Sequence, residues 1–501
     1  MSATVVALIK LGAALGAAGA SYWLGRGSSR AASAVLAACA ALAVCAYFQF
    51  GRLPAGFVHR WEMFHYYVGS KYHAELGYER LYTCAAIADA EDGLAASPRR
   101  LIRDLATDGT VHAAVIAQHP ETCKAHFSAA RWSDFRRDVR FFRKGLGRRQ
   151  WEQAQLDHGY NPPPLWTTTW GALANRVPAT WSNVRWLASI DLLLMAGVLV
   201  ALTTAFGWRA AALGAVFWGT QAASEVGWTG GGFVRQDWLF CAVAGIALLR
   251  LQRFGWAGAA LMLAGLLRVF PALLLAAVVL VWLWRWGKER RPPRALSRFA
   301  LGALVCVTLA GGASVASQGA SDHRQFWSHI QLRREAIVSN HMGLRTLIAG
   351  APLEVNSVRA PDEPHWVSQR RQRLAILSDV HRVVLVGGVL LVLAAIIQAR
   401  QAWAAAALGT ALIPLLLDPS NYYYSFFVLL VPLMRKQPAL AVLLCVIAAG
   451  GQLLGLRFAA DASRFFALSC LYVAAALFLA LAFVRWPRSA RFVSLHSESS
   501  I

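Results

Sequence analysis

Apolar residues along this chain gather into long blocks that are separated by short basic loops. A block of about 20 apolar residues is long enough to cross a bilayer as a helix. The pattern predicts about 13 spans, which lie near residues 4–25, 31–50, 183–206, 209–226, 236–251, 254–268, 269–285, 295–315, 380–398, 402–418, 420–434, 438–456 and 464–485. We therefore expect an all-α fold that is a polytopic transmembrane helical bundle.

Two long polar stretches interrupt the apolar blocks. They divide the chain into two N-terminal spans (1–50), a large loop (51–182), a transmembrane core (183–315), a second loop (316–379), C-terminal spans (380–485) and a tail (486–501). Basic residues such as Arg26, Arg209 and Arg485 fall in alternate short segments, which are cytoplasmic by the positive-inside rule. Both large loops are then extracytoplasmic and the tail is cytoplasmic. This arrangement predicts an integral protein of a bacterial inner membrane.

One stretch of the large loop has helical periodicity. Between residues 134 and 151, Phe135, Val139 and Phe142 recur at helical spacing while arginines cover the other faces. The pattern fits a helix that lies flat on the membrane surface, and it fits equally an amphipathic helix packed on the bundle. Both alternatives keep the large loop close to the bilayer.

Composition and charge agree with a membrane protein. The 501 residues are 57% hydrophobic and 15% charged, with 49 Lys and Arg against 26 Asp and Glu, a net charge of +23. In a soluble protein this charge would suggest nucleic acid as a partner. Here the cations set the orientation and meet anionic head groups, so membrane lipids are the expected partners and nucleic acid is not. Cys84 and Cys123 share the large loop, and the sequence leaves their pairing open.

Polar residues at the ends of spans are the candidates for chemistry, because charge is costly inside a membrane. Glu62 follows the second predicted span, where a carboxylate can act as a general base toward a hydroxyl group. The alternative is that it only pairs with Arg60 or Lys71.

Two arginines are candidates for binding an anion. Arg268 stands alone between two apolar halves, and a buried guanidinium needs a counter-charge such as a phosphate. Arg235 has the same need, and its alternative is an internal pair with Asp237 or Glu225. The other candidates for substrate binding are His65, Tyr66, Tyr67, Lys71, Asp157, His158, Tyr160, Asn161, Gln236, Asp237, Asn340 and His341.

Some familiar motifs are missing from the sequence. It contains no nucleotide-binding glycine loop, no zinc-type cysteine pair, no HExxH and no GxSxG. No metal site is indicated, and a divalent cation is the one cofactor left open. Tyr422, Tyr423 and Tyr424 are typical of the aromatic belt at a membrane interface.

Five short motifs occur in a recognisable order. They are Glu62 with Tyr66, Tyr67, Gly77 and Tyr82, then Tyr160-Asn161-Pro162, Arg235-Gln236-Asp237-Trp238, Arg268-Val269-Phe270-Pro271 and Asn340-His341. In this order the chain resembles the GT-C superfamily of membrane glycosyltransferases, and most closely its polyprenyl-phosphate-mannose-dependent alpha-1,2-mannosyltransferases. That family usually has Asp at the place of Glu62 and Lys at the place of Arg268. Asp134, Asp138 or Asp157 is the alternative acid.

The resemblance implies a GT-C-like fold and a glycosyltransferase. Such an enzyme moves a sugar, mannose in that family, from a polyprenyl-phosphate donor to a hydroxyl of a lipid or glycan acceptor on the outer face. Glu62 would be the base, and Arg235, Arg268 and His341 would neutralise the leaving phosphate. The sugars would be oriented by His65, Tyr66, Asp157 and Asn161. A lipid or sugar transporter and a non-catalytic scaffold remain the alternatives.

Overall fold

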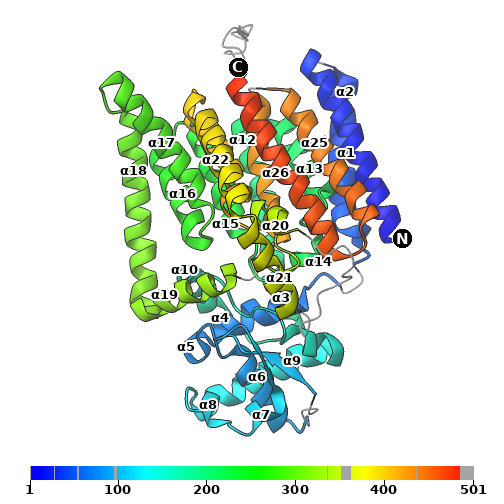
Figure 1. Cartoon of the computed structure of the whole chain (residues 1–501), viewed down its shortest axis with the longest axis vertical. Coiled ribbons are helices and arrows are strands. Elements are labelled where there is room, and N and C mark those ends of the chain that lie inside the picture. Colours follow the sequence, from blue (N-terminus) through cyan, green and yellow to red (C-terminus); the bar gives the residue numbers. More distant parts are fainter. Residues whose placement is uncertain are drawn as a thin grey trace.

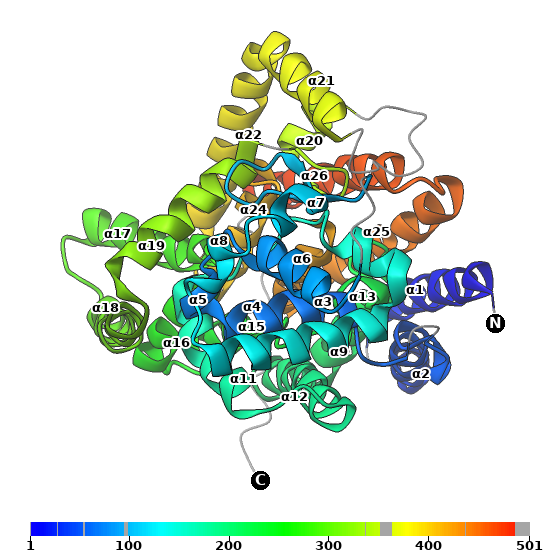
Figure 2. The same ribbon diagram turned by 90° about the horizontal axis from the view of Figure 1, so that it is seen from below.

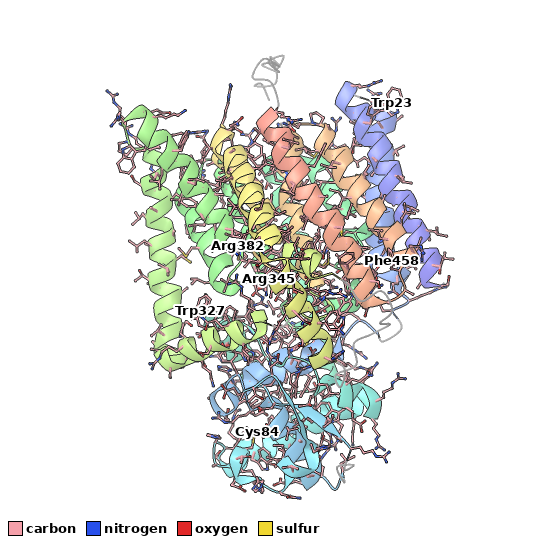
Figure 3. The ribbon with its side chains drawn as sticks, viewed as in Figure 1. Trp23, Cys84, Trp327, Arg345, Arg382 and Phe458 are labelled. Atoms are coloured by element: carbon pink, nitrogen blue, oxygen red, sulfur yellow. A yellow bond between two sulfur atoms is a disulfide. The ribbon has the colours of Figure 1, made fainter. Side chains whose placement is uncertain are left out.

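A helical bundle and a smaller domain at one of its ends make up the molecule (Figure 1). The computed structural model describes residues 2–27, 29–53, 56–94, 99–335, 337–350, 363–435 and 437–485, and the predicted tail (486–501) lies outside this part. Helix makes up 79% of the chain and strand 2%, which confirms the all-α class. The smaller domain, formed by residues 56–176, is called the loop domain below. Cys84 marks it in Figure 3, and Trp23 marks the opposite end of the bundle.

Seven helices of the described part are long and apolar enough to cross a membrane. They are α1 (Ala3–Arg26), α2 (Arg30–Tyr47), α12 (Trp181–Phe206), the continuous run of α18 (Arg294–Cys306), η4 (Val307–Gly311) and α19 (Gly312–Glu335), then α22 (Ser378–Gln398), α25 (Ala439–Arg457) and α26 (Asp461–Arg485). These helices are compatible with an integral membrane protein.

A total near 13 is not confirmed, because the six other predicted spans correspond to elements that are short, divided or, in α17, charged toward the end. They are α13 (Trp208–Thr220), α15 (Asp237–Arg250), α16 (Phe254–Leu267), α17 (Ala272–Glu289), the run of α23 (Ala402–Gly409), η5 (Thr410–Leu412) and α24 (Ile413–Leu416), and η6 (Asn421–Arg435). A helix of 14 residues such as α15 is about 21 Å long, less than the roughly 30 Å of a hydrocarbon core. All of α23 and most of η6 are buried. Their apolar sequences therefore reflect burial inside the protein as well as membrane depth.

One long helix, α9, and a series of short helices build the loop domain and connect it to the bundle. They are η1 (Gln49–Gly51), α3 (Arg60–Met63), the π-helical turn η2 (Phe64–Val68), α4 (Gly69–Lys71), α5 (His73–Leu76), α6 (Leu81–Glu91), α7 (Ala113–Ala117), α8 (Glu121–Lys124), α9 (Ala129–Ala154), α10 (Pro164–Trp166), the π-helical turn η3 (Thr167–Gly171) and α11 (Ala172–Arg176). Strands β1 (Leu101–Arg103) and β2 (Thr110–His112) pair antiparallel. The remaining helices are α14 (Val226–Thr229), α20 (Leu344–Ala349) and α21 (Glu363–Ile376). Seen from below, α6 lies near the centre of the domain (Figure 2).

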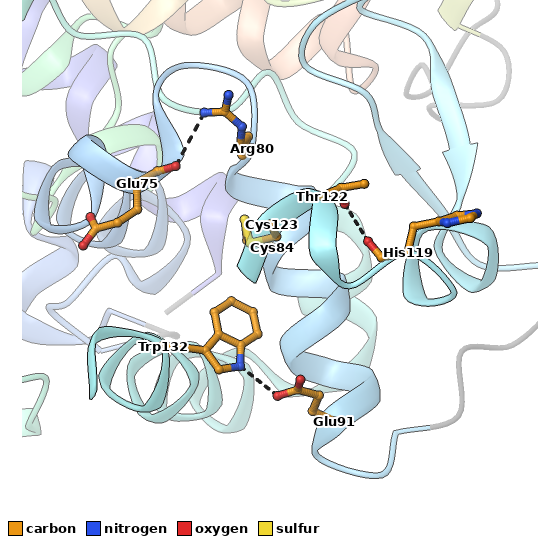
Figure 4. The surroundings of a disulfide bond; sticks show 8 residues. All are labelled: Glu75, Arg80, Cys84, Glu91, His119, Thr122, Cys123 and Trp132. Carbon is orange, nitrogen blue, oxygen red and sulfur yellow. Dashed lines mark hydrogen bonds between the residues drawn. A yellow bond between two sulfur atoms is a disulfide. The ribbon is translucent and has the colours of Figure 1, made fainter. Parts of the chain in front are cut away.

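A disulfide joins two helices of the loop domain. Cys84 on α6 is bonded to Cys123 on α8, and their Cα atoms lie 5.4 Å apart (Figure 4). The pairing that the sequence left open is therefore formed. The bond closes a segment of 39 residues across the centre of the domain.

The amphipathic stretch predicted at 134–151 is part of the longer helix α9. Its apolar side chains Phe135, Val139 and Phe142 are fully buried, and α9 packs on α3 and α6. Its arginines meet the carboxylates at the end of α6. The apolar face of α9 is therefore covered within the loop domain, which is nearer to the packed alternative, and a contact of α9 with a membrane surface stays a prediction.

Candidate functional site

Two buried arginines converge on one tyrosine where the loop domain meets the bundle. Arg235 precedes α15 and Arg268 follows α16, and their exposed fractions are 3% and 5%. Their Cζ atoms lie 3.9 Å and 5.8 Å from the centre of the Tyr66 ring. Glu62 Oε2 lies 3.1 Å from Arg235 Nε. Glu62, Tyr66, Arg235 and Arg268 are called the arginine–tyrosine cluster below.

Further aromatic rings enclose the two guanidinium groups. The centre of the Trp166 ring lies 5.7 Å from Arg268 Cζ, and the rings of Tyr422 and Tyr423 lie 5.0 Å and 5.8 Å from Arg235 Cζ. The aromatic-belt prediction for residues 422–424 is wrong. Tyr424 is fully buried, and the rings of Tyr422 and Tyr423 face Arg235. Cation–π contacts of this kind stabilise a buried cation without neutralising it.

Two further acids near the cluster, Asp191 and Asp237, are occupied by N–H donors. Asp191 of α12 accepts the backbone N–H groups of Arg235, at 2.8 and 3.0 Å, and of Gln236, at 2.9 Å. Asp237 accepts Trp170 Nε1 at 2.9 Å and the backbone N–H of Trp238 at 2.7 Å. Both carboxylates therefore hold the α15 entrance in place instead of pairing with the arginines.

The guanidinium groups keep several buried N–H groups free. Nη1 and Nη2 of Arg235, and Nε and Nη2 of Arg268, make no hydrogen bond to any described residue. The expected alternative pairs of Arg235 are not formed, since Asp237 is engaged as above and Glu225 binds Lys10 at 3.1 Å. Such N–H groups are costly to bury unpaired and are suited to an anion.

A tight backbone contact brings Glu62 next to Arg235. Gly231, with φ +73°, accepts a hydrogen bond from the backbone N–H of His59 at 3.0 Å. A Cβ at this position would lie 1.8 Å from the carbonyl oxygen of Phe57. Only glycine fits, and the loop before α15 therefore lies directly against the start of α3.

The two neighbours of Tyr66 in the π-helical turn, His65 and Tyr67, contact other residues than the arginines. His65 Nε2 lies 2.6 Å from the Tyr82 hydroxyl and Nδ1 lies 2.9 Å from the Trp61 carbonyl oxygen. Tyr67 donates to the Val177 carbonyl. His65 and Tyr67 are thus used inside the loop domain, and of the predicted residues in this turn only Tyr66 meets the arginines.

Neither alternative partner of Glu62 is paired with it. Lys71 Nζ lies 2.8 Å from Asp138 Oδ2 in a buried ion pair and donates to the Tyr67 hydroxyl at 2.9 Å. Arg60 donates to the carbonyl of Gly145. Glu62 is therefore the acid of the cluster, and Asp138 is not available as an alternative base. Asp134, the other alternative from α9, is 44% exposed and pairs with Arg137.

The predicted polar loop at residues 157–161 forms a neighbouring network. Asp157 accepts Trp61 Nε1 at 2.7 Å and the backbone N–H of His158 at 2.8 Å. Burial acts to raise the pKa of Asp157, but the charges of His65 and His158 and the Trp61 hydrogen bond outweigh it, so the pKa is lowered. A carboxylate held in this way is poorly suited to accept a proton.

The same loop ties the loop domain to α19. His158 Nδ1 lies 2.7 Å from Arg333 Nη1, and Asn161 Oδ1 lies 2.7 Å from His329 Nε2. Tyr160 is fully buried, and its ring centre lies 6.1 Å from that of Tyr66. The loop is thus a connector between two parts of the chain, and only Tyr160 adjoins the cluster.

Asn340 and His341 are held beside η6 by backbone pairing. The Asn340 carbonyl accepts the backbone N–H of Asn421 at 2.8 Å, and His341 forms a bridge with Ser420. Their partners, Asn421 and Ser420, immediately precede Tyr422, whose ring faces Arg235. Gln236 also lies next to the cluster, and its buried Oε1 has no hydrogen-bond partner in the described chain.

Sequence reasoning missed two residues that shape the site, Asp191 and Trp166. A lone carboxylate within the apolar block 183–206 was a usable signal for Asp191, because a charge at that depth needs a purpose. Trp166 gave no such signal among the 20 tryptophans of the chain. Within the described residues, no group of three or more His, Cys, Asp and Glu side chains is arranged to hold a metal ion.

Fold and site together define a helical protein with long apolar helices and a buried cationic, aromatic cluster at its domain junction. Comparisons of the chain with protein-family models, with curated proteins and with solved structures found no match.

Proposed function

We propose that this protein is an integral-membrane glycosyltransferase. It takes a sugar from a polyprenyl-phosphate donor and transfers it to a hydroxyl of a lipid or glycan acceptor at the outer face of the membrane. The observation that carries the proposal is a carboxylate, Glu62, beside two buried arginines with unpartnered N–H groups. Phosphate matches the forked geometry of a guanidinium, and a base adjacent to that phosphate is what sugar transfer requires.

In the proposed transfer step, Glu62, Arg235 and Arg268 each have a task. The acceptor oxygen bonds to the anomeric carbon as the bond from that carbon to the phosphate oxygen breaks. The hydroxyl proton passes to Glu62, and the electron pair of the broken bond leaves with the polyprenyl phosphate. Arg235 and Arg268 stabilise the charge that develops on this leaving group, in a site with little water. Arg235 Nε stays beside Glu62, which leaves Nη1 and Nη2 for the phosphate.

Two features support an outward orientation of the loop domain. Disulfides such as Cys84–Cys123 persist in oxidising compartments outside the cytosol. Basic residues occupy the helix ends at the opposite pole of the bundle, including Arg26 of α1, Arg250 of α15 and Arg485 of α26. The positive-inside rule makes that pole cytoplasmic. An outer site has little access to nucleotide sugars, which favours a lipid-linked donor.

The decisive experiment is transfer by the purified protein in lipid nanodiscs, with radiolabelled polyprenyl-phosphate sugars and an acceptor extract from the native membrane. Glu62→Gln should lower transfer by about 10²–10⁴-fold, the usual contribution of a general base. Glu152→Gln is the matched control, because the ion pair of Glu152 is with Arg148, whose side chain is 82% exposed. Full transfer by the Glu62 variant would refute the role of base.

A lipid or sugar transporter is the competing function. A transporter would move the labelled lipid between leaflets and leave its sugar–phosphate bond intact. Chemical analysis of the product therefore separates the two functions. Movement without transfer would reject the enzyme.

A further inference from the structure

A hollow of about 310 Å³ with basic and aromatic walls lies at the end of the bundle opposite the loop domain. Arg250 of α15, Phe254 of α16, Trp282 and Arg285 of α17, and Trp403 of α23 line it. Helix α15 follows Arg235 and ends at Arg250, and α17 follows Arg268 and carries Trp282 and Arg285 in its second half, so both helices lead from the cluster to the hollow. The length of α15 separates the two places by about 21 Å. The hollow is therefore distinct from the proposed active site.

The charge of the hollow is positive and incompletely balanced. Arg285 donates to the carbonyl of Ala399 at 3.0 Å, which leaves its charge uncompensated. Arg250 forms no ion pair within the described chain, although it ends α15 at the edge of the hollow. Glu289 is the one acid of the lining. An anion in the hollow would relieve this excess.

The surroundings of the hollow match the head-group level of a bilayer. Leu283, Trp284 and Trp286 of α17 are 44–48% exposed and present apolar area next to it. Tryptophan is enriched at membrane–water interfaces. The end of α17, the loop after it and the start of α18 add further cations, namely Lys288, Arg290, Arg291, Arg294 and Arg298. Basic pockets between helices on the cytoplasmic side of membrane proteins bind the head groups of anionic lipids.

We propose that this hollow binds the phosphate head group of an anionic phospholipid in the leaflet opposite the loop domain. Arg250 and Arg285 contact the phosphate, Trp282 and Trp403 hold the glycerol region, and the acyl chains lie along the exposed face of α17. The exposed apolar face beside the hollow favours a lipid over a soluble phosphate, since a soluble ion would make no use of it. This site does not depend on the proposed transferase activity.

The test measures binding of phosphatidylglycerol to the purified full-length protein by native mass spectrometry. A basic residue near an anionic membrane surface strengthens lipid binding, so removal of one arginine should weaken phosphatidylglycerol binding about fivefold. The double variant Arg250→Ala with Arg285→Ala should weaken it about 30-fold. The charge-matched control is Arg291→Ala with Arg298→Ala, which removes two cations of the same region outside the hollow. Equal loss in both double variants would overturn the site, because it would reveal diffuse surface attraction.

A second variant keeps the proposal testable if the arginine variants fail to fold. Glu289 is exposed, and Glu289→Gln should strengthen phosphatidylglycerol binding by up to about fivefold. Unchanged binding in this variant would contradict the site. Glycerol phosphate is the competitor that identifies the source of the phosphate. Complete displacement of the lipid by glycerol phosphate would show that the hollow binds a soluble phosphate and would overturn the proposal. Lipid that stays bound supports the proposal.

Discussion

Arginines in two regions of this molecule differ in how many carboxylates they pair with. In the loop domain, α6 and α9 share an acid–arginine network in which Asp89 and Asp92 meet Arg100, Arg136, Arg140 and Arg143. Asp89 alone accepts Arg100 Nη2 at 2.6 Å and Arg143 Nη1 at 2.7 Å. In the arginine–tyrosine cluster Glu62 lies beside Arg235, while Asp191 and Asp237 accept N–H groups of the backbone and of tryptophan.

The difference separates arginines whose charge is balanced by carboxylates from arginines that keep buried N–H groups without a hydrogen bond to the described residues. A buried charge with a partner is destabilising only when the partner is removed, whereas a buried charge without one is destabilising in the free protein. Residues held in unfavourable surroundings are typical of functional sites. Stability should therefore respond to changes in the network, and transfer should respond to changes in the cluster.

The largest effect on stability is expected at Asp89, which is 1% exposed. Asp89→Asn removes the charge partner of Arg100 and leaves Arg143 with Asp92 alone, and breaking a buried pair costs about 3–5 kcal/mol. Urea titration with protease protection of the loop domain as readout measures the loss. Asp134→Asn is the control, because its pair with Arg137 is exposed and should change stability by less than about 1 kcal/mol. A loss of similar size in both variants would contradict the comparison.

At Arg268 the effect should appear in transfer and not in stability. Arg268→Met keeps the volume of the side chain and removes its charge. Loss of one group that stabilises developing charge should lower transfer by about 10²–10³-fold. The unfolding midpoint should stay equal or rise, because an unpaired buried charge is gone. Destabilisation with unchanged specific activity would assign Arg268 to the fold.

Loss of the disulfide should give an intermediate effect that is confined to the loop domain. Cys84→Ser with Cys123→Ser frees a segment of 39 residues and should lower stability by about 2–4 kcal/mol. Cys45→Ser tests a free, exposed cysteine as the control. The protease assay checks the prediction, and equal protection of both variants would show that α6 and α8 need no covalent link.

The smallest effect concerns acid conditions and Asp92. Hydrogen bonds from Arg140 lead the causes that hold the pKa of Asp92 below its usual range, against burial. A lowered pKa in the folded state contributes stability that is present above the unfolded pKa near 3.9 and is lost as the pH falls below it. Loop-domain protection should therefore decline below about pH 4, and less steeply in Asp92→Asn. A parallel decline in both proteins would exclude Asp92 as the cause.

Sequence patterns predicted the class of fold better than the number of spans. Continuous apolar blocks such as 4–25 and 464–485 became long helices. Blocks such as 402–418 became short, divided elements, because burial inside a protein and burial in lipid select the same residues. The helical stretch near 134–151 was predicted correctly, and the sequence left open what covers its apolar face. Periodicity identifies an apolar face and does not identify what covers it.

The candidate site was predictable where a charged residue stood alone. Glu62, Arg235 and Arg268 were singled out because each is costly at a span end, and the structure brings them together. His65 and Lys71 looked similar in sequence but are engaged inside the loop domain. Their partners, Tyr82 and Asp138, are separated from them by 17 residues and by 67 residues, and such contacts leave no trace in local spacing.

The missing side chain of Gly231 has a consequence for motion. Main chain touches main chain between the loop before α15 and the start of α3, and the hydrogen bond from His59 N–H spans the junction. Any rocking of the loop domain must carry this seam with it. Acid and cation would then travel as a single rigid unit, and a hinge that admits a bulky lipid has to bend elsewhere along the chain.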